Sequence, residues 1–591
     1  MMIPGLLNLA RDLISLSWLT GPIFDKELRV SSRRRRNYVV RFVYLALLTV
    51  LLVLFWLEAV HYRSSSALLI ASRMARAGQT IIMFIVWFQF CATQVLALVT
   101  LSTSISDEIY HRTLGLLMTT PVNSFQIVMG KLFSKLLQLI LLLAISLPIL
   151  AIVRVFGGVP WDYVLSSLCV TLTAAIFVGS VSLFFSIFSR RAYAVIIMAT
   201  LTLGALFAVL PLITAMLVHP FVSERAFFSA FSYLNPYVLL FFTTESMMSP
   251  RMGGWMSPAP WLLHCGIMLA GSIAVLLTSV VLVRKTALRQ ATGQLGASAR
   301  RASSADSDLA DQAHAAALPK RVKGPCVLWK ELKSPVFGRH KVAAATATAV
   351  GMVLLFITYG LCARERILDE EEIHVLYVII FLGLGMLFTI IVPATCITSE
   401  KESRSWPLLL ATPLDSWQIV LGKFIGGLRR CLPIWVLLFG HLVVFSLAST
   451  IHPVAVIQMA ILVSWIIVFL SSSGVYLSSR FQRTTTAVIV NLALAGVIWG
   501  LAPLLMFLAL DVADMSDDPA EAYMDTNPFF QAVVTIDATT RGGQHGYGWA
   551  GLGTSDALEA TIWMLACMAG YMSLGVLFIW RAKARLRRDV F

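Results

Sequence analysis

Long apolar runs recur along the whole sequence, and each is long enough to cross a lipid bilayer, which takes about 20 residues. The bilayer core offers no water to backbone groups, so a spanning segment must satisfy its own N–H and C=O groups as a helix. The chain is 58% hydrophobic and only 13% charged, against about 25% charged in ordinary soluble domains. The sequence therefore predicts an all-α polytopic membrane protein and excludes a water-soluble globule.

The apolar runs predict about 12 transmembrane helices, six in each half of the chain. We expect them at about 38–60, 80–105, 132–153, 162–188, 193–218 and 261–283, and then at about 342–362, 375–398, 424–448, 454–478, 487–510 and 558–580. Residues 61–79 are expected to form an outer loop. The segment around Asn235-Pro236 is too apolar for a simple loop and too interrupted to span, which indicates a short re-entrant pair on the outer side.

One polar stretch between apolar runs occurs twice. Residues 108–131 and 400–423 align without a gap, at an offset of 292, and 12 of the 24 positions are identical. Lys26-Glu-Leu-Arg29 is echoed by Lys330-Glu-Leu-Lys333, and Asn235-Pro236 by Asn527-Pro528. Such self-similarity indicates an internal repeat. The chain is therefore expected to consist of two homologous six-helix halves.

The repeat and the local composition predict the domain boundaries. Residues 286–324 are rich in Ala, Ser, Gly and Arg and cannot bury a core, which indicates a flexible linker. The expected parts are cytoplasmic interfacial and elbow helices at 1–37, a first half at 38–285, the linker at 286–324 and a second half at 325–591.

Each copy of the repeated stretch has the pattern of a turn at the membrane surface. Glu108 lies four residues before Arg112, and Glu400 four before Arg404, a spacing that would place each pair on one helix face. Pro121 and Pro413 bias the threonine before them away from helical angles. Asn123 with Gln126, and Asp415 with Gln418, then have the spacing of a capping box that begins the next helix.

Charge predicts the orientation. The net charge of +15 would suggest nucleic acid in a soluble protein, but here the basic residues gather at the ends of spans, as in the cytoplasmic loops of membrane proteins. The predicted outer loops of the second half carry acidic clusters, at 369–372 and 511–525. We therefore expect a multi-pass protein of the plasma (inner) membrane with both termini cytoplasmic, in contact with the lipid bilayer and with no nucleic-acid partner.

The stretch Arg112-Thr-Leu-Gly-Leu-Leu-Met-Thr-Thr-Pro121 resembles the cytoplasmic coupling segment of ABC-2 type permeases, the membrane subunits of one class of ATP-binding cassette exporter. The second copy departs from the family pattern at Trp406-Pro407, where its local helix is expected to end early. The resemblance implies that residues 107–122 and 399–414 dock on an ATPase. The implied docking residues are Glu108, Arg112, Thr113, Leu116, Leu117, Thr120, Pro121, Glu400, Arg404, Ser405, Leu408, Leu409, Thr412 and Pro413. Gly130, Lys131, Gly422 and Lys423 lead into the third helix of each half.

The resemblance further implies a fused permease that exports an unidentified substrate and works with two copies of a cytoplasmic ATP-binding subunit. The chain has no Gly-x-x-x-x-Gly-Lys-Ser/Thr phosphate loop of its own. It is therefore not expected to be an enzyme or to bind a cofactor or metal, and ATP and Mg²⁺ would be bound by the partner.

Two other functions stay open: a non-transporting membrane scaffold coupled to an ATPase, and an ion-driven secondary transporter. Acidic residues are almost absent from the interiors of the predicted spans, which disfavours the secondary transporter. Gln138, His441, Gln458 and Asn491 lie in apolar runs, where we expect hydrogen bonds between helices.

Overall fold

The computed structural model describes residues 17–33, 35–61, 67–110, 113–114, 120, 122–155, 157–189, 192–218, 223–249, 260–291, 324–333, 341–513, 515–540 and 554–586. The chain divides into two compact units, residues 1–320 and 321–591. The described residues form helices and their connections, and the only β pairing among them is an isolated antiparallel bridge between Ile451 and Thr540. The all-α fold predicted from the apolar runs is confirmed.

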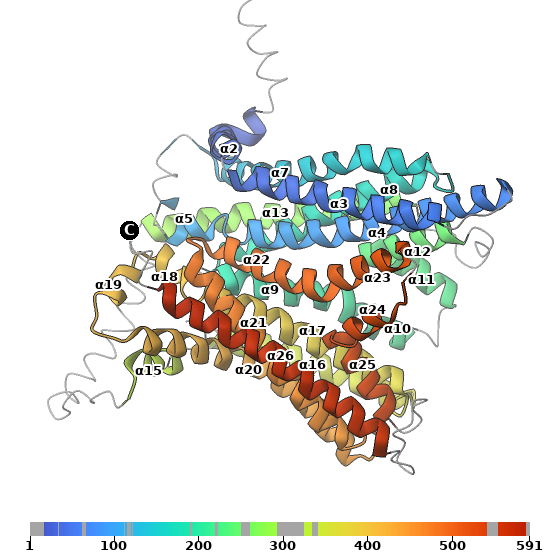
Figure 1. Cartoon of the computed structure of the whole chain (residues 1–591). Coiled ribbons are helices and arrows are strands. Elements are labelled where there is room, and N and C mark those ends of the chain that lie inside the picture. The colour runs from blue at the N-terminus through green and yellow to red at the C-terminus, as the bar shows by residue number, and fades with distance from the viewer. Residues whose placement is uncertain are drawn as a thin grey trace, which may run out of the picture. The chain divides into compact units, whose positions relative to one another are not determined.

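The first unit contains one short helix before its long apolar helices (Figure 1). Its helices are α2 (Ser17–Ser32), α3 (Arg35–His61), α4 (Ala67–Leu101), α5 (Ser106–Tyr110), α7 (Ser124–Arg154), α8 (Trp161–Ser186), α9 (Ala192–Gly204), the π-helical turn η1 (Ala205–Val209), α10 (Leu210–Val218), α11 (Glu224–Leu234), α12 (Pro236–Met248) and α13 (Trp261–Ala291). Within this unit α8 packs against α4 and α13, and α2 packs against α7.

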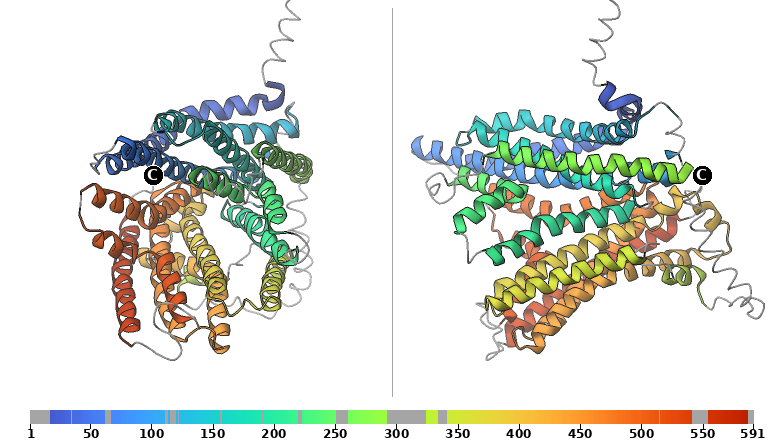
Figure 2. Two further views of the ribbon diagram at one scale, coloured as in Figure 1. Left: turned by 90° about the vertical axis from the view of Figure 1, so that its right-hand side faces the viewer. Right: turned by 180° about the vertical axis from the view of Figure 1, so that it is seen from behind.

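The second unit repeats this order. Its helices are α15 (Cys326–Lys333), α16 (Lys341–Arg364), α17 (Glu371–Thr395), α18 (Thr398–Glu402), α19 (Trp406–Leu410), α20 (Ser416–Leu447), α21 (Val454–Arg480), α22 (Thr484–Gly496), the π-helical turn η3 (Val497–Leu501), α23 (Ala502–Val512), α24 (Asp518–Met524), α25 (Pro528–Thr539) and α26 (Thr554–Arg585). Here α21 packs against α17 and α26, and α15 packs against α20. Figure 2 shows the long helices of each unit running alongside one another.

Eleven helical stretches in the described part of the chain are long and apolar enough to cross a membrane. They correspond to eleven of the spans expected from the sequence. The remaining span falls on α16, whose shorter apolar stretch is Thr348–Arg364. The protein is therefore an integral, multi-pass membrane protein.

One expected loop is wrong. Residues 61–79 were expected to connect the first two spans, but α4 begins at Ala67 and covers most of this segment. Alanines at 67, 71, 75 and 77 are strong helix formers, and the Gln79 amide donates to the carbonyl oxygens of Gly158 at 2.9 Å and Met247 at 3.0 Å. The helix continues because its polar residues find partners on neighbouring segments.

The structure describes only part of the expected linker and only part of the expected N-terminal helices. Helix α13 continues to Ala291, six residues past the expected boundary at 285, while residues 292–323 of the expected linker lie outside the described residues. Most of the interfacial helix expected near the N-terminus also lies outside the described residues, and α2 begins at Ser17 within the expected region 1–37.

Candidate functional site

The coupling segments, residues 107–122 and 399–414, follow the second long helix of each unit. The second segment is described in full, whereas Arg112, Leu116, Leu117 and Pro121 of the first lie outside the described residues. In the first segment Thr113 is half-buried, and its hydroxyl donates to the Glu108 carboxylate. Thr120 at its far end is exposed.

The second coupling segment consists of two short helices at a turn. Helix α18 ends at Glu402, and Arg404 adopts a left-handed conformation with φ 55°. Arg404 is therefore not on the same helix face as Glu400, and it makes no ion pair with that residue. The predicted i, i+4 pair is wrong here because the helix ends between its members.

The turn is closed by backbone hydrogen bonds, and a proline begins the helix that follows. The Ser405 N–H donates to the Glu400 carbonyl at 3.0 Å. Pro407 occupies the first turn of α19, where its missing N–H costs nothing. The local helix α18 ends at Glu402, before Trp406-Pro407, and this pair starts the next helix, α19. Thr412 ends the segment with its hydroxyl donating to the Leu409 carbonyl at 2.5 Å, directly before Pro413.

A buried lysine binds the second coupling segment to two other helices. Lys423 Nζ of α20 lies 2.5 Å from Glu400 Oε1 of α18 and 2.7 Å from Glu331 Oε1 of α15. Only 3% of the Lys423 side chain is exposed. Arg430 Nη2 contacts the other oxygen of Glu331 at 2.6 Å, and the exposed Lys330 reaches Glu400 at 3.1 Å. We call Lys423 and its counterpart Lys131 the anchor lysines.

The first unit repeats this arrangement. Lys131 Nζ of α7 lies 3.0 Å from Glu108 Oε1 of α5 and 2.9 Å from Glu27 Oε1 of α2. Lys135, one turn further along α7, comes to 4.0 Å from the second oxygen of Glu27. Each unit thus contains a Glu–Lys–Glu triad that connects three elements: an elbow helix, a coupling segment and the third long helix.

Sequence reasoning identified four members of the two triads and missed two. Glu108, Glu400, Lys131 and Lys423 were named as candidates, whereas Glu27 and Glu331 were noted only as parts of a repeated tetrapeptide. The signal was present, since a glutamate retained at the same place in both halves has a reason to be there.

Glycines let α15 approach α20 closely enough to form the triad. A Cβ atom on Gly422 would lie 2.9 Å from Val327 Cγ1, and one on Gly426 would lie 2.6 Å from Glu331 Cβ. Because neither distance leaves room for a methyl group, α15 lies directly on the backbone of α20. Gly130, the equivalent of Gly422, is buried in the first unit.

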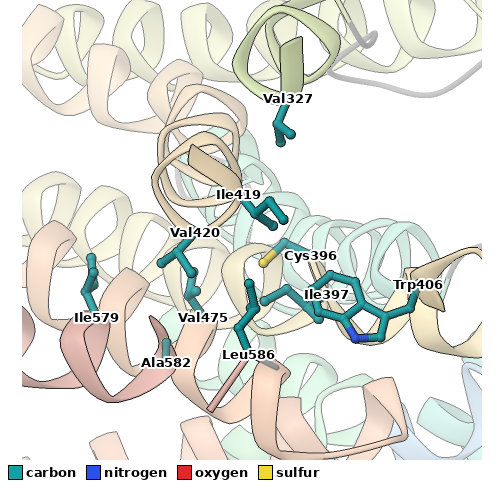
Figure 3. Packing of buried hydrophobic residues seen from close by; sticks show 10 residues of the cluster. All are labelled: Val327, Cys396, Ile397, Trp406, Ile419, Val420, Val475, Ile579, Ala582 and Leu586. Atoms are coloured by element: carbon teal, nitrogen blue, oxygen red, sulfur yellow. The ribbon is translucent and has the colours of Figure 1, made fainter. Parts of the chain in front are cut away.

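An apolar cluster lies beneath the second coupling segment (Figure 3). Trp406 of α19 is its member from the coupling segment, and Ile397 lies directly before α18. The other members are Val327, Cys396, Ile419, Val420, Val475, Ile579, Ala582 and Leu586. Leu409 packs against the same cluster. The segment is therefore held by apolar packing as well as by charge.

Polar contacts brace each coupling segment against a fourth element, the turn after the fourth long helix. In the second unit the Glu402 carboxylate accepts from the backbone N–H of Thr484 at 2.7 Å and from its hydroxyl at 2.7 Å. Lys401 Nζ donates to the carbonyl of Phe481 at 3.1 Å. In the first unit the hydroxyl of Ser106, the residue directly before the coupling segment, donates to the Ser189 carbonyl at 2.7 Å. These hydrogen bonds connect α5 and α18 to the turn that follows the fourth long helix of their unit.

The capping box predicted at the start of the third long helix forms in the first unit but not in the second. Asn123 is the N-cap of α7, and its backbone N–H donates to Gln126 Oε1 at 3.2 Å, as in a capping box. Asp415 is the N-cap of α20, but its side chain makes no capping hydrogen bond. The capping box is confirmed for α7, and the second copy retains only its position.

Some residues of the second segment point away from these contacts. Leu408 is 73% exposed, although leucine gains from burial, and Pro407 and Arg404 beside it are exposed too. Ser405 is half-buried and hydrogen-bonded to Ser403 at 2.7 Å. Leu408 is thus the exposed leucine of this segment.

The charges around Glu331 keep its carboxylate ionised. Burial opposes ionisation, but the neighbouring Lys423 and Arg430 outweigh it, and the pKa of Glu331 lies below its ordinary value. The carboxylate therefore remains a charged acceptor for both basic groups at neutral pH.

Polar side chains inside the long helices of the second unit make the expected bonds between helices. Asn491 Nδ2 donates to the Ile390 carbonyl at 2.9 Å, and Gln458 Nε2 donates to Thr561 Oγ1 at 3.1 Å. His441 Nδ1 lies 2.7 Å from the Tyr359 hydroxyl. His374, 5.4 Å from His441 between ring centres, is fully buried, and its two ring nitrogens have no hydrogen-bond partner among the described residues.

Comparison with known families identifies the chain. The family model described as "ABC-2 family transporter protein" matches residues 261–566, just over half of the sequence. The chain belongs to the ABC-2 transporter family. As a member, it is a membrane subunit of an ABC transporter, and ABC-2 permeases generally work with ATP-binding subunits. No curated protein matches this ABC-2 permease.

Proposed function

We propose that this ABC-2 permease is an exporter driven by two copies of a separate cytoplasmic ATP-binding subunit. The subunits would dock on the two coupling segments, and they would bind the ATP and Mg²⁺ that hydrolysis requires. The coupling segments and both termini would then lie on the cytoplasmic side of the plasma (inner) membrane, in agreement with the distribution of positive charge.

The paired Glu–Lys–Glu triads carry this proposal. A docking segment can move the membrane helices only if it is rigidly attached to them. Side chains that are free to change conformation would absorb its displacement. Lys423 binds Glu400 and Glu331 while almost wholly buried, and a buried pair of this kind is costly to break. Closure of the ATPase subunits would therefore move elbow helix, coupling segment and third helix together in each half.

Leu408 supports docking on the second segment. Leu408 and the two exposed residues near it leave apolar surface in water, and a docked partner would gain free energy by burying it. Its counterpart at the offset of 292 is Leu116, so the two halves would offer the same residue to two copies of one subunit.

Leu408→Arg tests the docking without disturbing the triad. Leu447→Arg is the matched control. Leu447 is also an exposed leucine, 82% exposed, but it is the last residue of α20 and lies far from the coupling segment at the N-terminal end of that helix. Full-length protein is purified gently from its native membranes, and co-purifying ATPase activity is measured together with the identity of any subunit that carries a phosphate loop. We expect Leu408→Arg to lower recovery of that subunit at least tenfold and Leu447→Arg to leave it unchanged.

Two results would overturn the proposal. Recovery of the subunit at the wild-type level with Leu408→Arg would rule out docking at this residue. A wild-type chain that purifies without any ATPase in several mild detergents would favour the secondary transporter or a scaffold that lacks a stable ATPase partner.

A further inference from the structure

Both units contain a π-helical turn at the same place in the fifth long helix. The turns are η1 (Ala205–Val209) and η3 (Val497–Leu501), which are separated by the repeat offset of 292. Well under 1% of residues in proteins adopt this conformation. A π turn widens the helix and takes carbonyl groups out of the regular i to i+4 ladder, and such turns are frequent at functional sites. Its occurrence in both halves indicates a selected feature.

An asparagine side chain binds each π turn. Asn235 Nδ2 donates to the Phe207 carbonyl at 2.7 Å, and Asn527 Nδ2 donates to the Trp499 carbonyl at 2.7 Å. These are again equivalent residues, since both donors and both acceptors are 292 apart.

The same asparagines also cap the helix that follows each of them. Asn235 Oδ1 accepts from the backbone N–H of Tyr237 at 3.0 Å, and Asn527 Oδ1 accepts from that of Phe529 at 3.0 Å. One amide group thus uses its oxygen for the N-terminus of α12 or α25 and its nitrogen for the π turn.

The hydrogen bond of Asn235 places the turn of its hairpin beside the middle of the fifth helix. Phe207 lies 11 residues before the end of α10 at Val218, which corresponds to about 16 Å along a helix. The turn between α11 and α12 therefore reaches deep beside the fifth helix, and Asn235 is 3% exposed there. The short helical hairpin expected around Asn235-Pro236 is therefore present, and its re-entrant position in the bilayer stays a prediction.

We propose that Asn235 and Asn527 are latches that fix the re-entrant hairpin of each half to the π turn of the fifth helix, so that hairpin and helix move as one body. In the transport cycle of the proposed permease, the hairpin would follow the fifth helix and would open or close the end of each half opposite its coupling segment. Asn235 and Asn527 are thus positioning residues, since they act through the hairpin.

The two latches are unequal. In the second unit the Tyr523 hydroxyl also donates to a π-turn carbonyl, that of Ile498 at 2.8 Å. The equivalent residue in the first half is Phe231, which has no hydroxyl group. Among the described residues, the second π turn therefore accepts from two side-chain donors of its hairpin, and the first π turn accepts from one.

Hydrogen–deuterium exchange of the full chain in lipid nanodiscs tests the latches without a partner or a substrate. Asn235→Asp keeps the oxygen that caps α12 but loses the amide donor. We expect deuterium uptake to rise about threefold to tenfold in both η1 and α12, because one buried hydrogen bond is lost from a local opening reaction. Thr202→Val is the control, since the Thr202 hydroxyl bonds only within its own helix, to the Met198 carbonyl at 2.8 Å.

The pH dependence of deuterium uptake distinguishes loss of this one hydrogen bond from a general destabilisation of the fold. In acid a protonated carboxyl group at position 235 can donate again, so the uptake of Asn235→Asp should return towards that of the wild type at the same pH. Asn235→Ala should show no such recovery. His264 lies nearby, with Nδ1 2.8 Å from the Tyr233 carbonyl oxygen, and comparison with the wild type at each pH corrects for its titration.

Tyr523→Phe is the mildest variant, since it reproduces the residue of the first half and should fold. It should raise uptake in η3 and α25 together, by less than Asn527→Asp does. Uptake that rises in the hairpin alone, or that stays at the wild-type level in both Tyr523→Phe and Asn527→Asp, would overturn the latch. Neither outcome would touch the proposed ATPase docking, which depends on the opposite ends of the helices.

Discussion

Lys423 is a full positive charge with 3% of its side chain exposed. Burial of an ion costs several kcal/mol even after relaxation, and the cost is recovered only through close, well-oriented partners. Glu331 and Glu400 supply two such partners at 2.7 and 2.5 Å. The lysine thus makes the attachment of the coupling segment depend on three residues at once, and loss of any one of them leaves a buried charge.

Lys423→Met should destabilise the folded chain by about 3–5 kcal/mol, because it leaves two buried carboxylates without their shared cation. Lys330→Met is the control. Lys330 contacts Glu400 at 3.1 Å but is 65% exposed, so its loss should cost under about 1 kcal/mol. Thermal unfolding in detergent or nanodiscs measures both, and equal losses of stability would show that the anchor lysine has no special role.

The Glu331 carboxylate should make stability depend on pH in the acid range. Its pKa in the folded chain lies below its ordinary value of 4.5, so its contribution is complete above about pH 4.5 and is lost as the pH falls through the folded-state pKa. Glu331→Gln should therefore be less stable than wild type at neutral pH, and the difference should shrink below pH 4.5. A difference in melting temperature that is constant with pH would contradict this expectation.

At the scale of helices, glycines on one face of α20 decide how near α15 comes. Gly422 and Gly426 meet α15 within van der Waals distance, whereas Gly440 on the same helix has no atom within 4 Å of a built Cβ. The elbow helix therefore depends on backbone contact at two positions, one turn apart. Without it, Glu331 could not reach the anchor lysine.

Gly426→Ala should destabilise the second unit by about 1–3 kcal/mol through overpacking, because its methyl group would lie 2.6 Å from Glu331 Cβ. Gly440→Ala should be neutral or stabilising, since alanine favours a helix by about 1 kcal/mol over glycine. In otherwise identical protein, the melting temperature should fall with Gly426→Ala and should stay the same or rise with Gly440→Ala. Similar shifts for both variants would exclude close packing at Gly426.

The sequence predicted elements better than it predicted their contacts. Apolar runs located eleven helices that can span the membrane, and the repeat located both coupling segments. The Glu400–Arg404 pair was wrong because residue spacing assumes a continuous helix, and α18 ends at Glu402. The partner of Glu400 was instead Lys423, on a helix that begins after a turn. Such contacts depend on tertiary packing, which periodicity does not record.

At the scale of the whole molecule, the halves share a fold but differ in their polar interiors. His374 and His441 pack with Tyr359 and Tyr377 in the second unit. At an offset of 292, His374 corresponds to Ile82, a buried apolar residue of the first unit. The fold therefore does not require the histidine, and its unpaired ring nitrogens make it a cost to stability.

His374→Ile should raise stability by up to about 1 kcal/mol, since it removes a buried imidazole that has no hydrogen-bond partner among the described residues. The reciprocal change, Ile82→His, should lower stability by about 1–3 kcal/mol, because it buries a polar ring in an apolar site. Unfolding of the two single variants measures both signs. Loss of stability on His374→Ile would show that the ring is needed for packing instead.

An evolutionary consequence follows from the histidines of the second unit. A permease assembled from two copies of one gene product carries every substitution twice, so a destabilising side chain is paid for in both subunits. Duplication and fusion remove that doubling: one copy can accumulate residues that cost stability while the other preserves the ancestral packing. His374 aligns with Ile82 of the first half. This is the pattern expected when one half of a fused chain diverges and the other keeps an apolar core.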